Sequence, residues 1–244
     1  MLNLEEYQKM YILEDFYWWF VGRRKIIVDF LKGLYTGRSN RKILDVGCGT
    51  GAILKYLDQF GSTMGVDKSA EALRFCRSRA RKSLLQGDAQ KLPIRDNIFD
   101  LVTAFDLLEH IEVDEQALKE FYRVTKKDGM LLMTVPAYRF LWSEHDEALG
   151  HKRRYGLKEL KGKVLGAGFK IIKISYAITI LFFPILVIRL LQKIFKPRKE
   201  PKTALIMLPG LMNSFFSSTL YLEAMLLRKL YLPFGVSIIC IAQK

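Results

Sequence analysis

Three aspartates and one glycine-rich turn are the residues of this sequence best suited to hold a small ligand. Asp45 stands two residues before Gly47 in the run Ile43-Leu-Asp-Val-Gly-Cys-Gly-Thr-Gly51, and Asp67 and Asp88 follow later, each at the end of an apolar segment. Glycines after a buried strand let the backbone approach a ligand closely, and the helix that follows presents free amides to negative groups. We therefore expect a ligand site at this turn.

The glycines alone are compatible with two kinds of cofactor. Gly47-Cys-Gly-Thr-Gly-Ala52 also matches the looser dinucleotide fingerprint, so a nicotinamide-dependent oxidoreductase is an alternative. Asp45 favours another ligand, because a carboxylate beside the turn repels a pyrophosphate and attracts an ammonium or a sulfonium. S-adenosylmethionine carries both positive groups. Asp67 can accept ribose hydroxyls with either cofactor, and Asp88 is placed to accept from the exocyclic amine of an adenine.

The elements that would position these acids alternate between strand and helix. Apolar runs predict strands near 42–47, 62–67, 83–88, 98–105 and 130–135, helices near 51–60, 69–82, 114–126 and 157–166, and a sixth strand over 169–175. This rhythm predicts a parallel sheet with right-handed crossovers. Because ligands of such sheets bind outside the carboxyl ends of the strands, the three acids are expected at one edge.

In order and spacing, the motifs resemble those of class I S-adenosylmethionine-dependent methyltransferases. They are the 43–51 run, Gly65-Val-Asp67, Gly87-Asp-Ala89, Leu92-Pro93, Phe99-Asp-Leu-Val102 and Leu107-Leu-Glu-His-Ile111. The resemblance covers about residues 41–175 plus the last strand. It implies a Rossmann-like α/β fold with the strand order 3-2-1-4-5-7-6 and an antiparallel last strand. It also implies S-adenosyl-L-methionine as the cofactor and S-adenosyl-L-homocysteine as the product.

The resemblance further implies which residues contact the cofactor. Asp45 and the turn would hold the methionine moiety, the acid after the second strand the ribose, the residues after the third strand the adenine, and those after the fourth strand would form a wall beside the sulfonium. The expected cofactor-binding set is Asp45, Gly47, Cys48, Gly49, Gly51, Asp67, Lys68, Asp88, Ala89, Phe105 and Asp106.

Residues that act on the methyl acceptor are expected after the fourth and fifth strands, where all three histidines of the chain fall. Methyl transfer requires an aligned acceptor and, where the acceptor loses a proton, a base. His145, held by Glu144 or Asp146, is the first predicted base. His110 is the second, although a structural role at a helix start suits it equally well.

The loop 135–155 is expected to bind the acceptor, because regular structure does not require its mixture of aromatic, acidic and basic side chains. Its arginines could hold an anionic part of the acceptor. A lid that only shields the cofactor is the alternative, and the aromatic residues near the N-terminus could equally form a hydrophobic helix face. The predicted acceptor-binding residues are Trp19, Trp142, His151, Arg153, Arg154 and Tyr155.

Residues 176–234 interrupt the strand-and-helix rhythm with apolar helix around a basic run at 196–202. We expect a helical cap over 1–40, a catalytic domain over 41–175 plus 235–244, and this segment as an insertion. Its two uncharged stretches contain Pro184 or Pro209 with Gly210, which argues against spanning helices. Helices on an anionic membrane surface fit the pattern better. A homodimer interface or a lid over an apolar substrate are the alternatives.

The composition and charge limit the class of protein and the compartment in which it works. Hydrophobic residues make up 50% of the 244 residues, which indicates a folded protein, and the net charge of +14 permits anionic partners. Cys48, Cys76 and Cys240 lack zinc-ligand spacing, so no metal site and no disulfide are expected. The N-terminus lacks the pattern of a secretory signal, which predicts a cytoplasmic protein. The segment 176–234 adds the expectation of a peripheral position at the inner face of the membrane.

These observations predict a methyltransferase that acts on an oxygen or nitrogen of a small-molecule or lipid-type acceptor near the membrane. Nucleic acid is a weaker candidate, because no motif for a flipped base and no RNA-binding module is found. The alternatives are an RNA or protein methyltransferase, the oxidoreductase named above, and a non-catalytic scaffold with the same fold.

Overall fold

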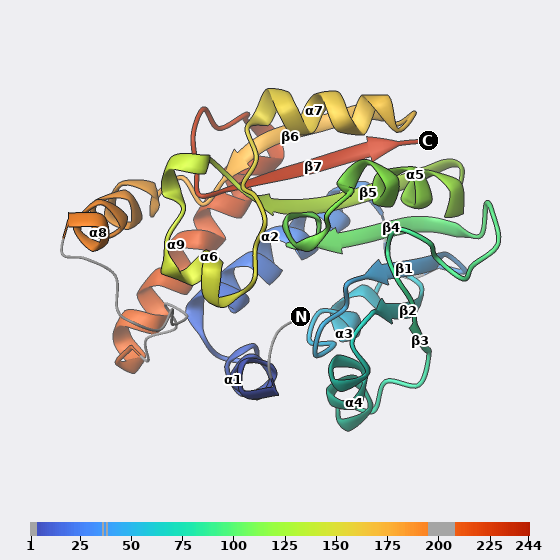
Figure 1. Ribbon diagram of the computed structural model, residues 1–244, viewed down its shortest axis with the longest axis horizontal. Helices are drawn as coiled ribbons and strands as arrows, with labels where there is room; N and C mark the ends of the chain where they lie inside the picture. The colour runs from blue at the N-terminus through green and yellow to red at the C-terminus, as the bar shows by residue number, and fades with distance from the viewer. Residues whose placement is uncertain (1–3, 36, 38, 195–207) are drawn as a thin grey trace.

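A seven-stranded sheet with the order β3-β2-β1-β4-β5-β7-β6 forms the centre of the computed structural model, which describes residues 4–35, 37, 39–194 and 208–244 (Figure 1). The strands are β1 (Lys42–Val46), β2 (Ser62–Asp67), β3 (Leu84–Gln86), β4 (Phe99–Phe105), β5 (Thr125–Pro136), β6 (Lys170–Ala177) and β7 (Ser237–Gln243). β1 to β5 pair in parallel, whereas β7 runs antiparallel to both β5 and β6. The predicted order and the antiparallel last strand are confirmed.

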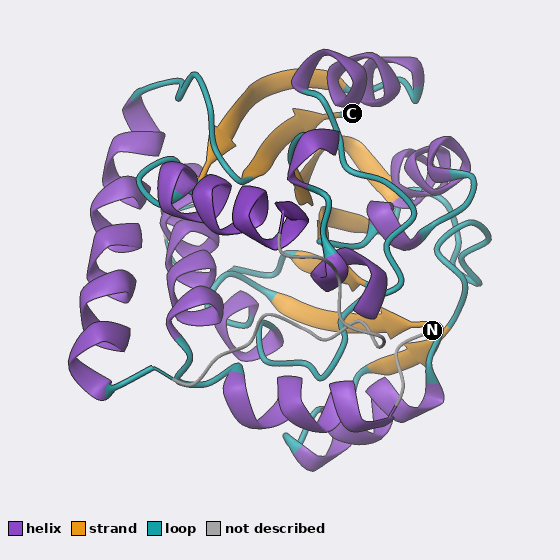
Figure 2. Cartoon of the chain, turned by 60° about the vertical axis from the view of Figure 1, so that its left-hand side comes forward, coloured by secondary structure: helices purple, strands orange, loops and turns teal. Residues whose placement is uncertain are grey.

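Helices cover both faces of this sheet (Figure 2). They are α1 (Leu4–Leu13), α2 (Trp18–Leu34), α3 (Leu54–Leu57), α4 (Ala70–Ser78), α5 (Asp114–Val124), α6 (Glu144–Ala148), α7 (Leu157–Gly166), α8 (Phe182–Ile194) and α9 (Gly210–Lys229), with short 3-10 turns η1 (Leu108–His110) and η2 (Arg139–Leu141). Neighbouring strand residues point to opposite faces, so Ile43 and Leu44 enter two separate cores. This double covering explains why β1 and β4 carry apolar residues on both faces.

Helices α2 and α9 pack closely on one face of the sheet because α2 carries a glycine at their contact. A Cβ atom at Gly22 would lie 2.2 Å from Cδ1 of Leu220. Asn213 of α9 also fixes the start of α2, since its Oδ1 accepts a hydrogen bond from the amide of Trp18 at 2.8 Å and its Nδ2 donates to the carbonyl of Phe16 at 2.8 Å. The N-terminal helices and the end of the insertion therefore hold each other in place.

The insertion has one buried and one exposed side. Leu220, Ala224 and Leu227 of α9 are fully buried and belong to the same core as α2. On the outer side, Leu211 is 89% exposed and Phe215 is 67% exposed. None of the helices in the described part of the chain is both long and apolar enough to cross a membrane. The basic run at 196–202 lies outside the described residues.

Several element ends differ from the predicted ones, for local reasons. Within the predicted helical cap, helix α2 begins only at Trp18, because the Glu14 carbonyl accepts a hydrogen bond from the Arg24 side chain at 2.7 Å and the chain is extended at Tyr17. Strand β5 begins at Thr125, five residues before the predicted start at 130, because the ladder between β4 and β5 continues through an irregularity between Phe99 and Leu101. Helix α3 covers only Leu54–Leu57 of the predicted 51–60.

Candidate functional site

The glycine-rich turn after β1 has a backbone that leaves room for a ligand. Gly47, Gly49 and Gly51 have φ values of 72°, 54° and 81°, a region that residues with side chains rarely adopt. A Cβ at Gly47 would lie 2.7 Å from Cδ1 of Leu107, whereas no heavy atom lies within 4 Å of the corresponding position at Gly49. Open space therefore borders the turn at Gly49.

Asp45 places a buried carboxylate under this turn. The residue is 1% exposed, and its Oδ1 accepts a hydrogen bond of 2.6 Å from the Thr103 hydroxyl. Burial raises the pKa of Asp45 to about 7. Among the described residues no cationic side chain forms an ion pair with it. A buried carboxylate in this state suits a ligand that brings its own positive charge.

Asp67 joins the turn to the following helix. One of its oxygens accepts from the amide of Gly49 at 2.9 Å and the other from the amide of Ser69 at 2.8 Å. Each carboxylate oxygen has a second lone pair, which leaves capacity for a hydroxyl donor. The buried Tyr7 forms a side-chain hydrogen bond with Ser69, so α1 reaches this part of the site.

Asp88 lies beyond the end of β3, next to the end of β2. Lys68, which was expected to contact the cofactor, places its ammonium 2.8 Å from the Asp88 carboxylate, and this contact lowers the pKa of Asp88. The amide of Gln90 donates to the same carboxylate at 2.9 Å. Ala89, the residue expected at the adenine, is 8% exposed. The structure thus brings together the residues predicted at the ends of the first three strands.

Phe105 and Asp106 close the end of β4. Asp106 has a φ of 49°, an uncommon value that turns the chain sharply after the strand. One of its oxygens accepts a hydrogen bond from the Thr134 hydroxyl at 2.8 Å, and the other lies 2.7 Å from Nη1 of Arg23. A residue of α2 therefore contacts the segment that was predicted to form a wall beside the sulfonium.

Glu14, between α1 and α2, is a site neighbour that the sequence analysis missed. Its carboxylate accepts a hydrogen bond from the hydroxyl of Thr50 in the glycine-rich turn and lies 3.4 Å from Nη2 of Arg79. Burial raises the pKa of Glu14 to about 7. The one available signal was an acid within a strongly aromatic segment. Its partner could not be inferred, because Thr50 is distant in the chain.

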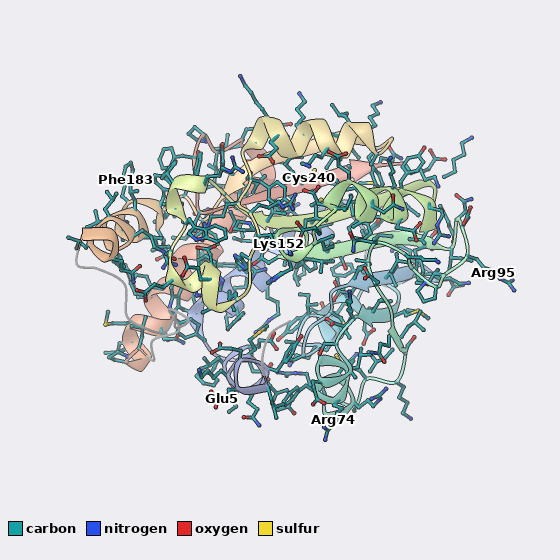
Figure 3. All side chains as sticks on the ribbon, viewed as in Figure 1. Glu5, Arg74, Arg95, Lys152, Phe183 and Cys240 are labelled. Carbon is teal, nitrogen blue, oxygen red and sulfur yellow. The ribbon has the colours of Figure 1, made fainter. Side chains whose placement is uncertain are left out.

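The loop after β5 is held by Asp146, which is fully buried. Its carboxylate lies 2.8 Å from Nδ1 of His151 and accepts hydrogen bonds from Arg154 at 2.7 and 3.1 Å. Asp146, which was predicted together with Glu144 to hold His145, pairs with His151 in the structure. Lys152, labelled in Figure 3, belongs to the same loop, and its amide donates to the Glu109 carbonyl at 2.8 Å. These bonds tie the loop to the end of β4.

The predicted acceptor-binding residues have protein partners of their own. Tyr155 is fully buried and donates to Asp114 at 2.7 Å, and Arg153 donates to the Glu112 carbonyl at 2.7 Å. Arg154, paired with Asp146, is 4% exposed. These contacts give the three side chains a structural role in the loop. Contact between them and an acceptor stays a prediction.

The two tryptophans in the predicted acceptor set lie apart from each other in the fold. The indole of Trp142 donates to Glu147 at 3.4 Å, within the loop after β5. Trp19 belongs to α2 and packs against the core with its ring centroid 5.5 Å from that of Trp18. This packing matches the hydrophobic helix face that the sequence analysis kept as an alternative for the N-terminal aromatic residues.

The candidate bases lie in an apolar environment. Burial lowers the pKa of both His110 and His145 to about 4, and the nearby Arg189 of α8 adds to the effect at His145. Both imidazoles are therefore neutral at pH 7. The ring of His110 meets that of His151 edge to face, with centroids 4.7 Å apart.

Comparison with known proteins locates a family match on this part of the fold. A family model described as a methyltransferase domain matches residues 44–133. The chain is 37% identical over 105 residues to demethylmenaquinone methyltransferase of Lactiplantibacillus plantarum, covering 38% of this chain and 44% of that protein. It is 30% identical over 135 residues to malonyl-[acyl-carrier protein] O-methyltransferase of Pectobacterium atrosepticum, and the match covers 52% of this chain and 53% of that protein. The chain thus spans about half the length of the curated relatives it matches.

A solved structure extends the likeness to the rest of the chain. The crystal structure of an S-adenosylmethionine-dependent methyltransferase from Thermotoga maritima, described as a possible histamine N-methyltransferase, matches with a TM-score of 0.61 and 20% identity. The match covers 98% of this chain and 95% of that chain. At this identity the likeness concerns the fold, and it includes the helices outside the segment that the family model matches.

Proposed function

For a chain that carries a class I S-adenosylmethionine-dependent methyltransferase domain, we propose methyl transfer to an oxygen or nitrogen of a small-molecule or lipid-type acceptor at the membrane surface. The observation that carries this proposal is the edge of the sheet where the strand ends meet. Asp45, Asp67 and Asp88 border the open turn there, and the histidine-bearing loop follows the neighbouring strand. Donor and acceptor sites would then adjoin each other.

The residues present fit S-adenosylmethionine. The buried carboxylate of Asp45, which has no cationic partner among the described side chains, would receive the ammonium of the methionine moiety. Asp67 would accept the ribose hydroxyls, and Asp88 with Ala89 would bind the adenine. Bound there, the cofactor supplies a methyl group on a positively charged sulfur. The protein's tasks are to align the acceptor with that methyl group and to exclude water.

His145 is the proposed base, with His110 as the second candidate. Both imidazoles are neutral at pH 7 and can take a proton from the acceptor. The cofactor, when bound, would supply the methyl group, and its sulfur would keep the electron pair of the broken carbon–sulfur bond. The acceptor proton passes to the imidazole.

Aromatic side chains favour an apolar acceptor. Tyr138, which follows β5, stacks on Phe140 with ring centroids 4.8 Å apart and on Tyr176 at 4.9 Å. Its ring also meets Phe182 of α8 at 5.9 Å, and Phe182 meets Phe183 at 5.5 Å. Phe183, labelled in Figure 3, is 60% exposed. A row of aromatic side chains therefore extends from the loop after β5 to helix α8.

The outer surface of α8 and α9 supports a position at a membrane. Exposed apolar side chains lie on both helices, and they include Phe183, Val187, Ile188, Leu190, Leu191, Leu211, Phe215 and Leu222. Arg189 of α8 adds positive charge beside them. Such a surface suits binding to anionic headgroups with apolar residues in the interface. A homodimer that buries the same surface is the second candidate use of these helices.

The acceptor can be identified with radiolabelled S-adenosylmethionine. The protein is incubated with separated lipid, small-molecule, glycan, RNA and protein fractions of a cell extract. We expect label in the lipid or small-molecule fraction, and none with Asp67→Ala. Label confined to RNA or protein would overturn the acceptor class while keeping the reaction. Absence of transfer to every fraction, together with no binding of S-adenosylhomocysteine, would overturn the proposed function.

A further inference from the structure

Glu109 is a fully buried acid without an evident partner. It is 0% exposed and lies in η1, directly after the end of β4. Neither of its carboxylate oxygens has a hydrogen-bond partner from another residue in the described part of the chain. An unpaired carboxylate in such a place is unfavourable unless it takes a proton or contacts a cation. The position therefore favours either a proton on Glu109 or a cation beside its carboxylate.

Two imidazole side chains lie close enough to the Glu109 carboxylate to bind a cation together with it. One ligand atom each from Glu109, His110 and His151 can be chosen so that all three lie within 4.8 Å of one another. His110 follows Glu109 in the chain, and His151 comes from the loop after β5. The hydrogen bond from the amide of Lys152 to the Glu109 carbonyl, 2.8 Å long, keeps that loop against η1. The cluster is thus built by the fold.

Each imidazole also has a contact outside the cluster. Nδ1 of His151 lies 2.8 Å from Oδ1 of Asp146, and Asp146 is fixed in turn by Arg154. His110 forms a hydrogen bond with the backbone of Gly150. Histidines that bind metal ions usually donate their second ring N–H to a carboxylate or a backbone carbonyl. His151 has a carboxylate contact of this kind and His110 a backbone contact, and each ring carries a second nitrogen that can serve as a ligand.

We propose that Glu109, His110 and His151 bind a divalent transition-metal ion. Two imidazole nitrogens and one carboxylate oxygen suit Zn²⁺ or Fe²⁺ better than Mg²⁺ or Ca²⁺, which prefer oxygen ligands. With bonds of about 2.0–2.1 Å in a tetrahedral site, neighbouring ligand atoms are about 3.3 Å apart. Binding would therefore draw the three ligand atoms, which lie within 4.8 Å of one another, closer together.

The site would also define the acceptor more narrowly, and this step rests on the proposed function. Three protein ligands leave an open position on the ion. A hydroxyl of the acceptor bound there would lose its proton near neutral pH and would then attack the methyl group as an alkoxide. As a metal ligand, His110 would no longer serve as a base. The proton would pass to solvent or to His145, and the methyl carbon would exchange its sulfur bond for an oxygen bond. The acceptor atom would accordingly be oxygen.

Metal binding can be measured without methyl transfer. The full chain, without a polyhistidine tag and after treatment with a chelator, is titrated with ZnCl₂ by calorimetry, and a parallel sample with Co²⁺ is followed by visible absorption. We expect one equivalent of Zn²⁺. Glu109→Gln and His151→Asn should weaken binding by about 100-fold or more. Glu112→Gln is the matched control, because Glu112 is exposed and outside the cluster, and it should bind as the wild type does.

Circular dichroism of each variant shows whether it is folded, and Glu109→Gln, which only removes a buried charge, is expected to remain so. Absence of stoichiometric Zn²⁺ binding to the wild type would overturn the proposal and leave a protonated Glu109 as the explanation. Equal affinities in the folded variants would also overturn it. Binding of S-adenosylhomocysteine is measured in the same samples. If the protein binds S-adenosylhomocysteine but not Zn²⁺, only the metal site is refuted. If it binds Zn²⁺ but not S-adenosylhomocysteine, only the proposed function is refuted.

Discussion

Nη1 of Arg23 lies 2.7 Å from Oδ2 of Asp106, so the second helix of the chain is tied to the end of the central strand β4. The side chains are 15% and 26% exposed, which makes this pair less screened than a surface ion pair. Asp106 is one of the two residues predicted to form a wall beside the sulfonium. The N-terminal helices would therefore border the proposed cofactor site.

Replacement of Arg23 should weaken both this wall and the cofactor site. Arg23→Gln leaves Asp106 half-buried and without its cation, and we expect a loss of about 1 kcal/mol of unfolding free energy. Binding of S-adenosylhomocysteine, measured by calorimetry, should weaken by about fivefold. Arg74→Gln is the control, because the side chain of Arg74 is 72% exposed and pairs with Glu71 on the surface of α4. Equal effects of the two substitutions would argue against a role of Arg23 in the site.

Asp67 should be required for cofactor binding. Its carboxylate holds the amides of Gly49 and Ser69 and is proposed to accept the ribose hydroxyls. S-adenosylhomocysteine at 100 times its Kd should stabilise the wild type by about 2.7 kcal/mol, and this gain should vanish in Asp67→Ala. Thermal unfolding with and without ligand measures it. Asp96→Ala, at a surface pair with Arg123, should keep the gain. Stabilisation by NADH in place of S-adenosylhomocysteine would support the oxidoreductase alternative.

Cofactor binding should strengthen as the pH rises through neutrality. Burial raises the pKa of Asp45 to about 7 in the free protein, with the Thr103 hydroxyl and the Asp67 carboxylate as its nearby polar groups. An ammonium prefers the deprotonated acid, so the affinity for S-adenosylhomocysteine should increase by about fivefold to tenfold from pH 6.0 to 7.5. The pKa of Asp45 is higher in the folded protein than in the unfolded chain, so the folded form holds the proton more tightly. The free energy of unfolding of the free protein should therefore fall as the pH rises from about 4 toward 7.

Calorimetric titrations at the two pH values check this expectation. Asp45→Asn should bind the ligand more weakly and with little pH dependence in this range. A variant that keeps the wild-type slope would assign the pH dependence to another group.

The close contact of α2 and α9 should depend on Gly22. Gly22→Ala forces a methyl group against Leu220 and should cost about 1–3 kcal/mol of unfolding free energy. Leu220→Ala alone should cost about 2–5 kcal/mol. The double variant should lose less than the sum, because the smaller side chain makes room for the methyl group. Denaturant unfolding measures all three. Gly33→Ala is the control on the same helix, since the nearest atom would lie 3.5 Å away.

The outer surface of the insertion should mediate membrane binding. Removal of residues 176–234 would also remove the buried side of α9, so exposed positions are the appropriate targets. Leu211→Ser with Phe215→Ser should reduce flotation with anionic vesicles by about tenfold, whereas Leu165→Ser on α7 should have no effect. Failure of the wild-type protein to float would contradict the membrane proposal. A concentration-dependent dimer by sedimentation, lost in the double variant, would favour the homodimer.

The sheet was predictable because its signals are local in the chain. Each apolar run that ends in Asp45, Asp67 or near Asp88 is short and bounded by polar residues, so both its type and its end could be inferred. The starts of α2 and β5 were less predictable, since they depend on the contact between Arg24 and Glu14 and on a ladder irregularity near Phe99. Such features require knowledge of distant neighbours.

The surroundings of the acceptor site were harder to infer for the same reason. Glu109 was visible only as part of a motif, and its lack of a partner appears once η1 is folded against the later loop. No short spacing of cysteines and histidines predicted a metal site, because His151 reaches the cluster from a different strand connection. Tyr7 and Glu14 likewise approach the site through the docking of α1.

The middle position of β7 also sets an order on the assembly of the protein. β6 has β7 as its partner in the sheet, and β7 comes after all the other strands in the chain. During synthesis, the first five strands can pair as they emerge from the ribosome, but β6 must wait for residues 237–243. Until then the edge of β5 stays open to other chains. Stalled or truncated products that end within the insertion are therefore expected to be the aggregation-prone forms of this protein.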